Sequence, residues 1–240
     1  MPLNYRDRTF HYLPQNKNEL QNDMVGVHKF CEIQRMLINE KKTQAVIFNT
    51  STKRDFTPRI TNPNGEIYKH VENFELLGVD LTSDRRKGIN FDTYLTKCIN
   101  KGFKNLWILR RLAEKGVSHD NLLLAYYSRV RVCVEMNIPL WSFSINKSMK
   151  KKIENLQKLS FFIILGKEAS KDYLCNLAIL DALPLEDRRQ QIIDKFAKKI
   201  LKHSDHRKIF TFVENNCTRK GKRIVIPYCR TARYNNMAIP

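Results

Sequence analysis

The chain has 240 residues, of which 42% are hydrophobic, and its 43 Lys and Arg residues against 24 Asp and Glu give a formal net charge of +19. This apolar fraction is enough for a packed core, and the length allows one large domain or two small ones. The charge is too positive for an ordinary cytosolic enzyme and indicates a polyanionic partner, nucleic acid ahead of an anionic membrane surface. A soluble domain that is merely basic is the alternative.

The spacing of the cysteines indicates the redox state of the compartment, and the basic residues are concentrated toward the end of the sequence. The six cysteines are widely spaced without a CxxC pair, and the chain has no secretory signal and no apolar run of the roughly 20 residues that cross a bilayer. These features predict free, mostly buried thiols in a reducing intracellular compartment, nucleus or cytoplasm, and no membrane partner. Twelve basic residues against two acidic ones lie between Lys195 and Pro240.

The first part of the chain predicts a small α+β piece after an irregular segment, residues 1–15. A helix is expected from Lys17 to about Leu37, with an apolar face formed by Leu20, Met24, Val27 and Cys31. The segments "TQAVIF", "EIYKHV" and "FELLGVDL" have the composition of strands and surround a "TNPNG" turn. They predict a small antiparallel sheet against this helix.

A helix with two contrasting faces is expected after "TSDRRKGIN", with Asn90 as its cap. Its apolar stripe has Gly102 in the middle and consists of Phe91, Leu95, Cys98, Leu106 and Leu109. On the opposite face, at 100° per residue, lie four cations: Lys97, Lys101, Lys104 and Arg111. Such a face suits a phosphate backbone, which needs cations and carries no sequence information. The alternative is a solvated helix surface.

Three more helices are expected before a basic, irregular tail. The first has Ser118 as its cap, ends at Pro139 and carries Leu122, Tyr126, Val130 and Cys133. The second spans Lys147 to Leu165 and stops at Gly166. The third follows Pro184, with Ile192, Ile193, Phe196 and Ile200 inward. The predicted organisation is an irregular segment at 1–15, an α+β piece at 16–85, a helical region at 86–203 and a basic tail at 204–240.

Common catalytic patterns are absent from the sequence, which has no GxSxG, HExxH, P-loop or GxGxxG motif and no adjacent pair of aspartates. One basic stretch holds His203, His206, Cys217 and Cys229. Their long, unpaired spacing is unlike a compact zinc site, so we expect no metal there. Four aromatic residues could stack on bases, although helical spacing is more typical of a core: Trp107, Tyr126, Tyr127 and Trp141.

Several motifs occur in an informative order. A helix is followed by "LINEKKTQAVIFN", then by "VENFELLGVDL", then by the basic "KGFKNLWILRRL". Later come "LLLAYYSRVRVCVEMNIPLW", "IENLQKLSFFIILG", "LPLEDRRQQIIDKFAKK" and "CRTARYNNMAIP". This ordered set resembles the C-terminal part of reverse transcriptases from non-LTR (LINE-type) retrotransposons, over nearly the whole chain. The resemblance implies the rear of a polymerase palm, a primer-grip hairpin, a helical thumb and the region that follows it.

The resemblance also implies roles for single residues. Lys42, or its neighbour Lys41, matches a lysine near the incoming nucleotide, where an ammonium group can protonate or neutralise the leaving pyrophosphate. Phe74, Leu77 and Gly78 match the primer grip, whose tight turn sets the primer 3′ end. The four cations of the basic helix match a thumb helix that contacts the template–primer backbone, RNA or DNA.

One departure from the family pattern limits the expected activity. Polymerisation in this family depends on aspartates that hold two Mg²⁺ ions, and the sequence contains no (F/Y)xDD box, early palm or fingers. Asp7 stands alone among basic residues and cannot substitute. The resemblance therefore predicts a fragment that binds no cofactor alone and is inactive without the missing palm and fingers segment. A stand-alone basic nucleic-acid-binding protein and a helical interaction protein are the alternatives.

Overall fold

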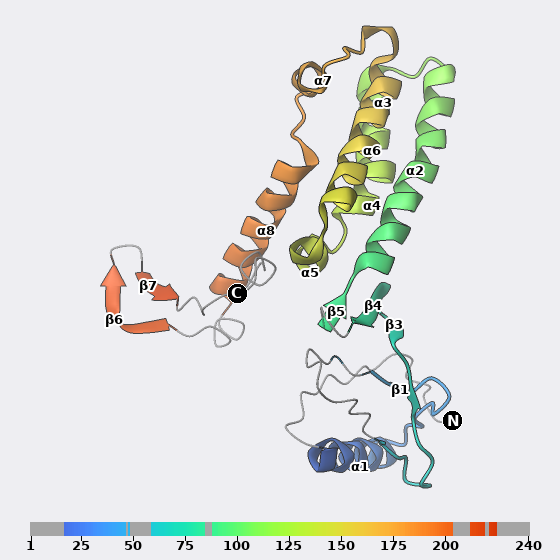
Figure 1. Ribbon diagram of the computed structural model, residues 1–240, viewed down its shortest axis with the longest axis vertical. Coiled ribbons are helices and arrows are strands. Elements are labelled where there is room, and N and C mark those ends of the chain that lie inside the picture. Colours follow the sequence, from blue (N-terminus) through green and yellow to red (C-terminus); the bar gives the residue numbers. More distant parts are fainter. Residues whose placement is uncertain are drawn as a thin grey trace. The chain divides into compact units, whose positions relative to one another are not determined.

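The computed structural model of the protein describes residues 17–46, 48, 59–84, 88–203, 212–218 and 221–224 (Figure 1). These residues form a mixed α+β fold with a small antiparallel sheet and a larger number of helices, which confirms the predicted fold class at this level. The chain divides into two compact units, Met1–Thr93 and Tyr94–Pro240.

The first unit begins with α1 (Lys17–Ile33), whose predicted apolar face is only partly buried. The helix ends at Ile33 rather than near Leu37, because Arg35 adopts a left-handed conformation with φ of 52°. The N–H of Met36 donates to the Cys31 carbonyl (2.7 Å), and the N–H of Arg35 donates to the Glu32 carbonyl (2.9 Å). This pair of bonds is a Schellman cap, which ends a helix and satisfies its last carbonyls.

The segment "TQAVIF" forms only a two-residue strand, β1 (Gln44–Ala45), which pairs with β2 (Lys69–His70). The pair is parallel, so the antiparallel arrangement expected here is wrong. A long connection between the two strands allows the parallel direction. The "TNPNG" turn is confirmed, because the N–H of Gly65 donates to the Asn62 carbonyl at 3.0 Å.

A three-stranded antiparallel sheet follows, in the order β3 (Asn73–Leu76), β4 (Val79–Asp84) and β5 (Gly88–Asn90). The segment "FELLGVDL" is therefore a hairpin, with Leu76 opposite Val79. Strand β5 was not predicted. The side-chain Oδ1 of Asn90 accepts a hydrogen bond from the Asp92 N–H (2.9 Å), which agrees with its expected place at the start of the next helix.

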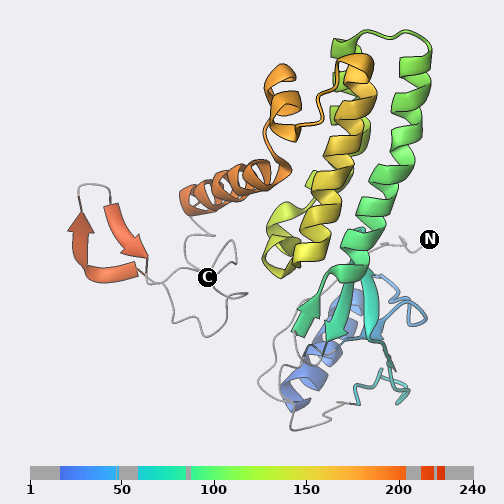
Figure 2. The same cartoon turned by 45° about the horizontal axis from the view of Figure 1, so that its top comes forward.

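The second unit is mainly helical. The first helix is α2 (Asp92–Glu114), which runs beside α6 and in the same direction (Figures 1 and 2). The other α-helices are α3 (His119–Ala125), α4 (Val132–Glu135), α5 (Ile138–Trp141), α6 (Lys147–Leu165), α7 (Tyr173–Ile179) and α8 (Leu185–Lys202). A π-helical stretch, Tyr126–Arg131, joins α3 to α4 without a break.

Several helix boundaries agree with the sequence and others do not. Helix α6 has the predicted limits, and Gly166 ends it with φ of 53°. Pro139 does not end a helix. It lies in the first turn of α5, where proline is tolerated, and the break comes earlier at left-handed Asn137. Helix α7 was not predicted. The tail is not wholly irregular, because β6 (Phe212–Thr218) and β7 (Gly221–Ile224) form an antiparallel pair.

The core of the second unit lies between α2, the α3–α4 segment and α6. Its largest fully buried side chains include Trp141, Tyr126 and Phe161. Tyr126 and Phe161 meet edge to face with ring centroids 5.5 Å apart. The predicted inward residues of α8 are only partly buried, so charged contacts contribute to its attachment: Glu135 Oε1 lies 3.1 Å from Arg188 Nε and 3.3 Å from Arg131 Nε.

Candidate nucleic-acid interface

Helix α2 has one buried face and one exposed face. Of the predicted stripe, Leu95, Leu106 and Leu109 are buried in α2, Phe91 is buried just before it, and Cys98 is only half-buried. Ile99, which was not predicted, is buried on this face as well. Gly102 lies where α2 approaches α6, and a Cβ atom there would be 2.6 Å from Leu156 Cδ2. The glycine thus lets the two helices pack, and this packing fixes which face of α2 meets solvent.

The four predicted cations are all on the exposed side of α2. Lys97, Lys101 and Lys104 are exposed along its first half. Arg111 is exposed in its last turn, 3.0 Å from Glu114 Oε2, and its guanidinium lies 5.7 Å from the Trp107 ring centroid. The face therefore presents its three lysines about one turn apart and Arg111 two turns further along, a spacing that can follow a phosphate backbone.

The hairpin between β3 and β4 presents Leu77 in a strained backbone conformation. Leu77 and Gly78 both have positive φ, 49° and 80°, as the central residues of a type I′ turn require. Asparagine and glycine favour this conformation, whereas leucine does not. The Leu77 side chain is nonetheless 87% exposed. Phe74, by contrast, is half-buried, with its ring centroid 6.1 Å from that of Phe48.

Lys42 lies in a turn that Asn39 organises. The N–H of Lys42 donates to the Asn39 carbonyl (3.0 Å) and to Asn39 Oδ1 (3.3 Å), and the Thr43 hydroxyl donates to the same carbonyl (3.0 Å). The side chains of Lys41 and Lys42 are both exposed. The structure fixes the backbone before β1 and leaves an accessible ammonium, whose role with a pyrophosphate stays a prediction.

The aromatic residues divide into core and surface. Trp141 and Tyr126 are buried, in agreement with the expectation that helical spacing indicates a core. Tyr127 is half-buried beneath Arg131, whose guanidinium lies 3.9 Å from the ring centroid. Trp107 differs, because 60% of its surface is exposed. The core position expected for Trp107 from helical spacing is therefore wrong, because this residue lies on the side of α2 that carries Lys104 and Arg111.

The cysteine that packs against α2, Cys133, does not have the properties of a reactive thiol. Cys133 packs against α2, where Asn105 Nδ2 lies 3.5 Å from its sulfur. Burial raises the pKa of this thiol, so it stays protonated at neutral pH. The expectation of mostly buried thiols is wrong among the described residues, because only Cys133 is buried: Cys31 and Cys98 are half-buried and Cys175 is exposed.

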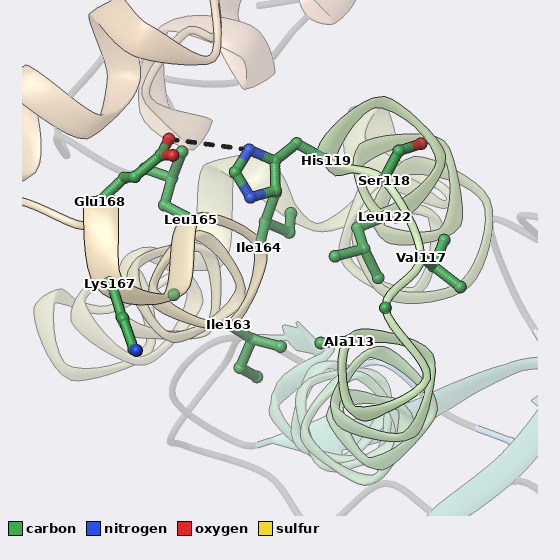
Figure 3. Close-up of a pocket in the computed structure, with 12 residues that line it drawn as sticks. Ala113, Val117, Ser118, His119, Leu122, Ile163, Ile164, Leu165, Lys167 and Glu168 are labelled. Atoms are coloured by element: carbon green, nitrogen blue, oxygen red, sulfur yellow. Dashed lines mark ion pairs between the residues drawn. The ribbon is translucent and has the colours of Figure 1, made fainter.

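A pocket of about 580 Å³ lies where α2, α3 and α6 meet at one end of the second unit (Figure 3). Its lining is mainly apolar and includes Leu122 and Ile164. The polar pair at its edge is His119 and Glu168, with Nδ1 and Oε2 3.8 Å apart and both side chains largely exposed. None of the predicted site residues lines this pocket.

No group of residues able to hold a metal ion occurs in the part of the chain that the structure describes. His203 is described, whereas His206, Cys229 and the side chain of Cys217 lie outside the described residues. Among the described helices, none is long and apolar enough to span a membrane. Comparison of the chain with known protein families, curated proteins and solved structures found no match.

Proposed function

We propose that this chain is the C-terminal region of a non-LTR-type reverse transcriptase and that it holds the sugar-phosphate backbone of a template–primer duplex on the exposed face of α2. In this proposal, the first unit is the rear of the palm with its primer-grip hairpin, and the helices of the second unit form the thumb. The ordered motifs of the sequence support the assignment.

The observation that carries the proposal is the two-faced character of α2. One face packs against α6 at Gly102, and the other face exposes Lys101 and Lys104 to solvent. Cations on a helix that is itself fixed in a core can bind phosphates without ordering the backbone on binding, which lowers the entropic cost of association. The net charge of +19 adds long-range attraction for a polyanion.

The turn at Leu77 gives independent support. An exposed leucine in left-handed conformation contributes little to the core and disfavours the turn, so its side chain gains nothing within the described fold. Strain of this kind is typical of residues retained for contact with a ligand. In the proposed function Leu77 contacts the primer end, and Gly78 allows the turn that presents it.

The proposed role is binding, because the sequence has no adjacent aspartates to hold the two Mg²⁺ ions of polymerase chemistry. Those ions and their carboxylates would belong to a palm and fingers segment of the intact polymerase. Lys42, exposed before β1, would act only in such an assembly. We therefore expect no nucleotide incorporation by these 240 residues alone.

A charge-reversal experiment tests the proposal. The double variant Lys101→Glu and Lys104→Glu should bind a 16-base-pair RNA–DNA hybrid at least tenfold more weakly than the parent chain, measured by fluorescence anisotropy at 0.1 M salt. The matched control is Lys195→Glu and Lys198→Glu, which reverses two exposed lysines at the same three-residue spacing on α8. This control should lose much less affinity.

Equal losses in the two double variants would contradict a specific role for α2. The same titration with double-stranded DNA and double-stranded RNA separates the two nucleic-acid hypotheses. A template–primer role predicts preference for the hybrid, whereas equal affinity for all three duplexes would favour a stand-alone basic binding protein. Circular dichroism should show the same helix content in every variant.

A further inference from the structure

An exposed apolar strip runs along the second unit beside the basic face of α2. We call it the aromatic strip, and it consists of Trp107 on α2 and Leu159 and Phe162 on α6, with half-buried Phe103 one turn before Trp107. Trp107 is 60% exposed, and Leu159 and Phe162 are 42% and 43% exposed. Exposed apolar side chains that gather in one place mark interaction sites more often than single exposed ones do.

Helix geometry places the members of the strip together. Helices α2 and α6 run in the same direction (Figures 1 and 2) and touch where Gly102 faces Leu156. At about 100° per residue, Trp107 lies about 140° round α2 from Gly102 in one sense, and Phe162 lies about 120° round α6 from Leu156 in the opposite sense. Residues displaced in opposite senses on two parallel helices lie on the same side of the pair.

The positions along the helix axes agree. Counted from the contact between Gly102 and Leu156, Trp107 lies about 7.5 Å along α2, and Leu159 and Phe162 lie about 4.5 Å and about 9 Å along α6. Trp107 therefore falls between the two α6 side chains in height. The three exposed side chains therefore lie on the same side of the helix pair and within about one helical turn of one another in height.

Cations border this surface on both helices. On α2, Lys104 and Arg111 lie about 60° and about 40° round the helix from Trp107. The Arg111 guanidinium is 5.7 Å from the Trp107 ring centroid. On α6, exposed Lys152 precedes Leu159 by seven residues and so lies on the same side, about two turns earlier. A strip of aromatic rings edged with cations has the chemistry of a single-strand binding surface, in which bases stack and phosphates pair with cations.

We propose that the aromatic strip binds the unpaired bases of a nucleic-acid strand, with Trp107 as the principal stacking platform. The inference rests on the proposed function, in which the neighbouring cations of α2 hold the duplex backbone. It adds a second ligand, the single strand that continues from that duplex. Stacking requires no hydrogen bonds to base edges, so binding at the strip is insensitive to base sequence.

The chain carries its own reporter for this proposal. It has two tryptophans, and Trp141 is buried while Trp107 is exposed. Stacking on Trp107 should quench the exposed component of tryptophan emission. The full chain is titrated with a blunt RNA–DNA hybrid and with the same hybrid carrying a six-nucleotide single-stranded extension, in separate RNA and DNA versions. Quenching is expected with the extended hybrid, and little with the blunt one.

Variants separate this proposal from the proposed function. Trp107→Ala should abolish the quenching and remove about tenfold of the affinity that the extension adds, while affinity for the blunt hybrid stays unchanged. Trp107→Phe, which keeps an aromatic face, should restore most of that affinity. The matched control Leu124→Ala removes another largely exposed apolar side chain, on α3, and should have no effect.

Two results would overturn the inference: an extension that adds affinity equally in the parent chain and in Trp107→Ala, or the absence of quenching while the extended hybrid is bound. Either result leaves the duplex role of α2 intact, because that role depends on the effect of Lys101→Glu and Lys104→Glu on the blunt hybrid. Conversely, loss of the blunt-hybrid effect with quenching retained would count against the duplex role.

Discussion

The two units of the chain differ in how much of their apolar surface they bury. Among the described residues, four buried hydrophobic side chains belong to the first unit (Ile60, Tyr68, Val79 and Phe91), and the other nineteen belong to the second. Helix α1 has no fully buried residue between Leu20 and Ile33, and Phe30 and Ile33 are exposed there. Among the described residues, the second unit therefore has the larger packed core, and α1 of the first unit leaves large apolar side chains exposed to solvent.

Two phenylalanines test this contrast most strongly. Phe161 is fully buried against Tyr126, and Phe30 is 43% exposed on α1. Phe161→Ala should lower the free energy of unfolding by about 4 kcal/mol, because it leaves a cavity in a packed core. Phe30→Ala should lower it by less than about 1 kcal/mol. Urea denaturation followed by circular dichroism measures both, and similar losses would contradict the contrast.

The contact between α2 and α6 gives the next largest effect. Gly102→Val should lower the free energy of unfolding by about 2 kcal/mol, because the new side chain would overlap Leu156. The double variant Gly102→Val with Leu156→Ala should recover part of that loss, since the smaller residue makes room. The control Gly26→Val lies on α1, where a Cβ would meet nothing within 4 Å. Additive effects of Gly102→Val and Leu156→Ala would rule out this contact.

The hairpin of the first unit offers an opposite, stabilising change. Leu77→Asn should raise the free energy of unfolding by about 0.5–1 kcal/mol, because asparagine followed by glycine favours a type I′ turn. Slower hydrogen exchange of the β3 and β4 amides would report the gain. Leu37→Asn serves as the control, since Leu37 is also exposed but lacks a positive φ. If Leu77→Asn did not raise the free energy of unfolding, the left-handed backbone of Leu77 would not be a source of strain in this turn.

The smallest expected effect concerns pH and the attachment of α8. Its Glu186 lies 2.7 Å from Lys150 Nζ on α6, and this hydrogen bond holds the pKa of Glu186 below its ordinary value of 4.5. The folded-state pKa is lower than the unfolded one, so the ionised carboxylate stabilises the fold above that ordinary value. The contribution is lost as pH falls through the lowered pKa.

Glu186→Gln should therefore reduce stability by less than about 1 kcal/mol at pH 7, because the pair is exposed to solvent. The difference between variant and parent should shrink toward pH 3. Melting temperatures measured between pH 7 and pH 3 check this. A difference that stayed constant over that range would show that the carboxylate charge is not involved.

Sequence patterns correctly predicted the limits of elements that begin and end at their own capping residues. Helix α6 has the expected limits because Asn146 caps its start, accepting a hydrogen bond from the Met149 N–H, and Gly166 supplies the left-handed residue at its end. The prediction that a helix ends at Pro139 was wrong, because proline can follow a helix or lie in its first turn. In the structure the preceding helix is interrupted at left-handed Asn137, and Pro139 lies in the first turn of α5. Helix α7 was not predicted, because its seven residues are too few to show a clear helical repeat of apolar residues.

The candidate site was predictable only in part, because local sequence patterns do not show which elements pack together. Periodicity placed Lys101 and Lys104 opposite the apolar stripe, and the structure has them exposed. The aromatic strip combines residues of α2 and α6, and which helices pack together depends on long-range contacts that local pattern does not contain. Likewise, periodicity identified the apolar face of α1 but could not tell whether any element covers it.

The salt dependence of hybrid binding tests the central claim, that α2 binds phosphates, most directly. Each lysine–phosphate contact releases counterions and contributes about 0.9 to the slope of log affinity against log salt concentration. Neutralising two contacts with Lys101→Gln and Lys104→Gln should therefore reduce the magnitude of the slope by about 1.8 relative to the parent chain. An unchanged slope, with both proteins folded and binding the blunt RNA–DNA hybrid, would contradict the account.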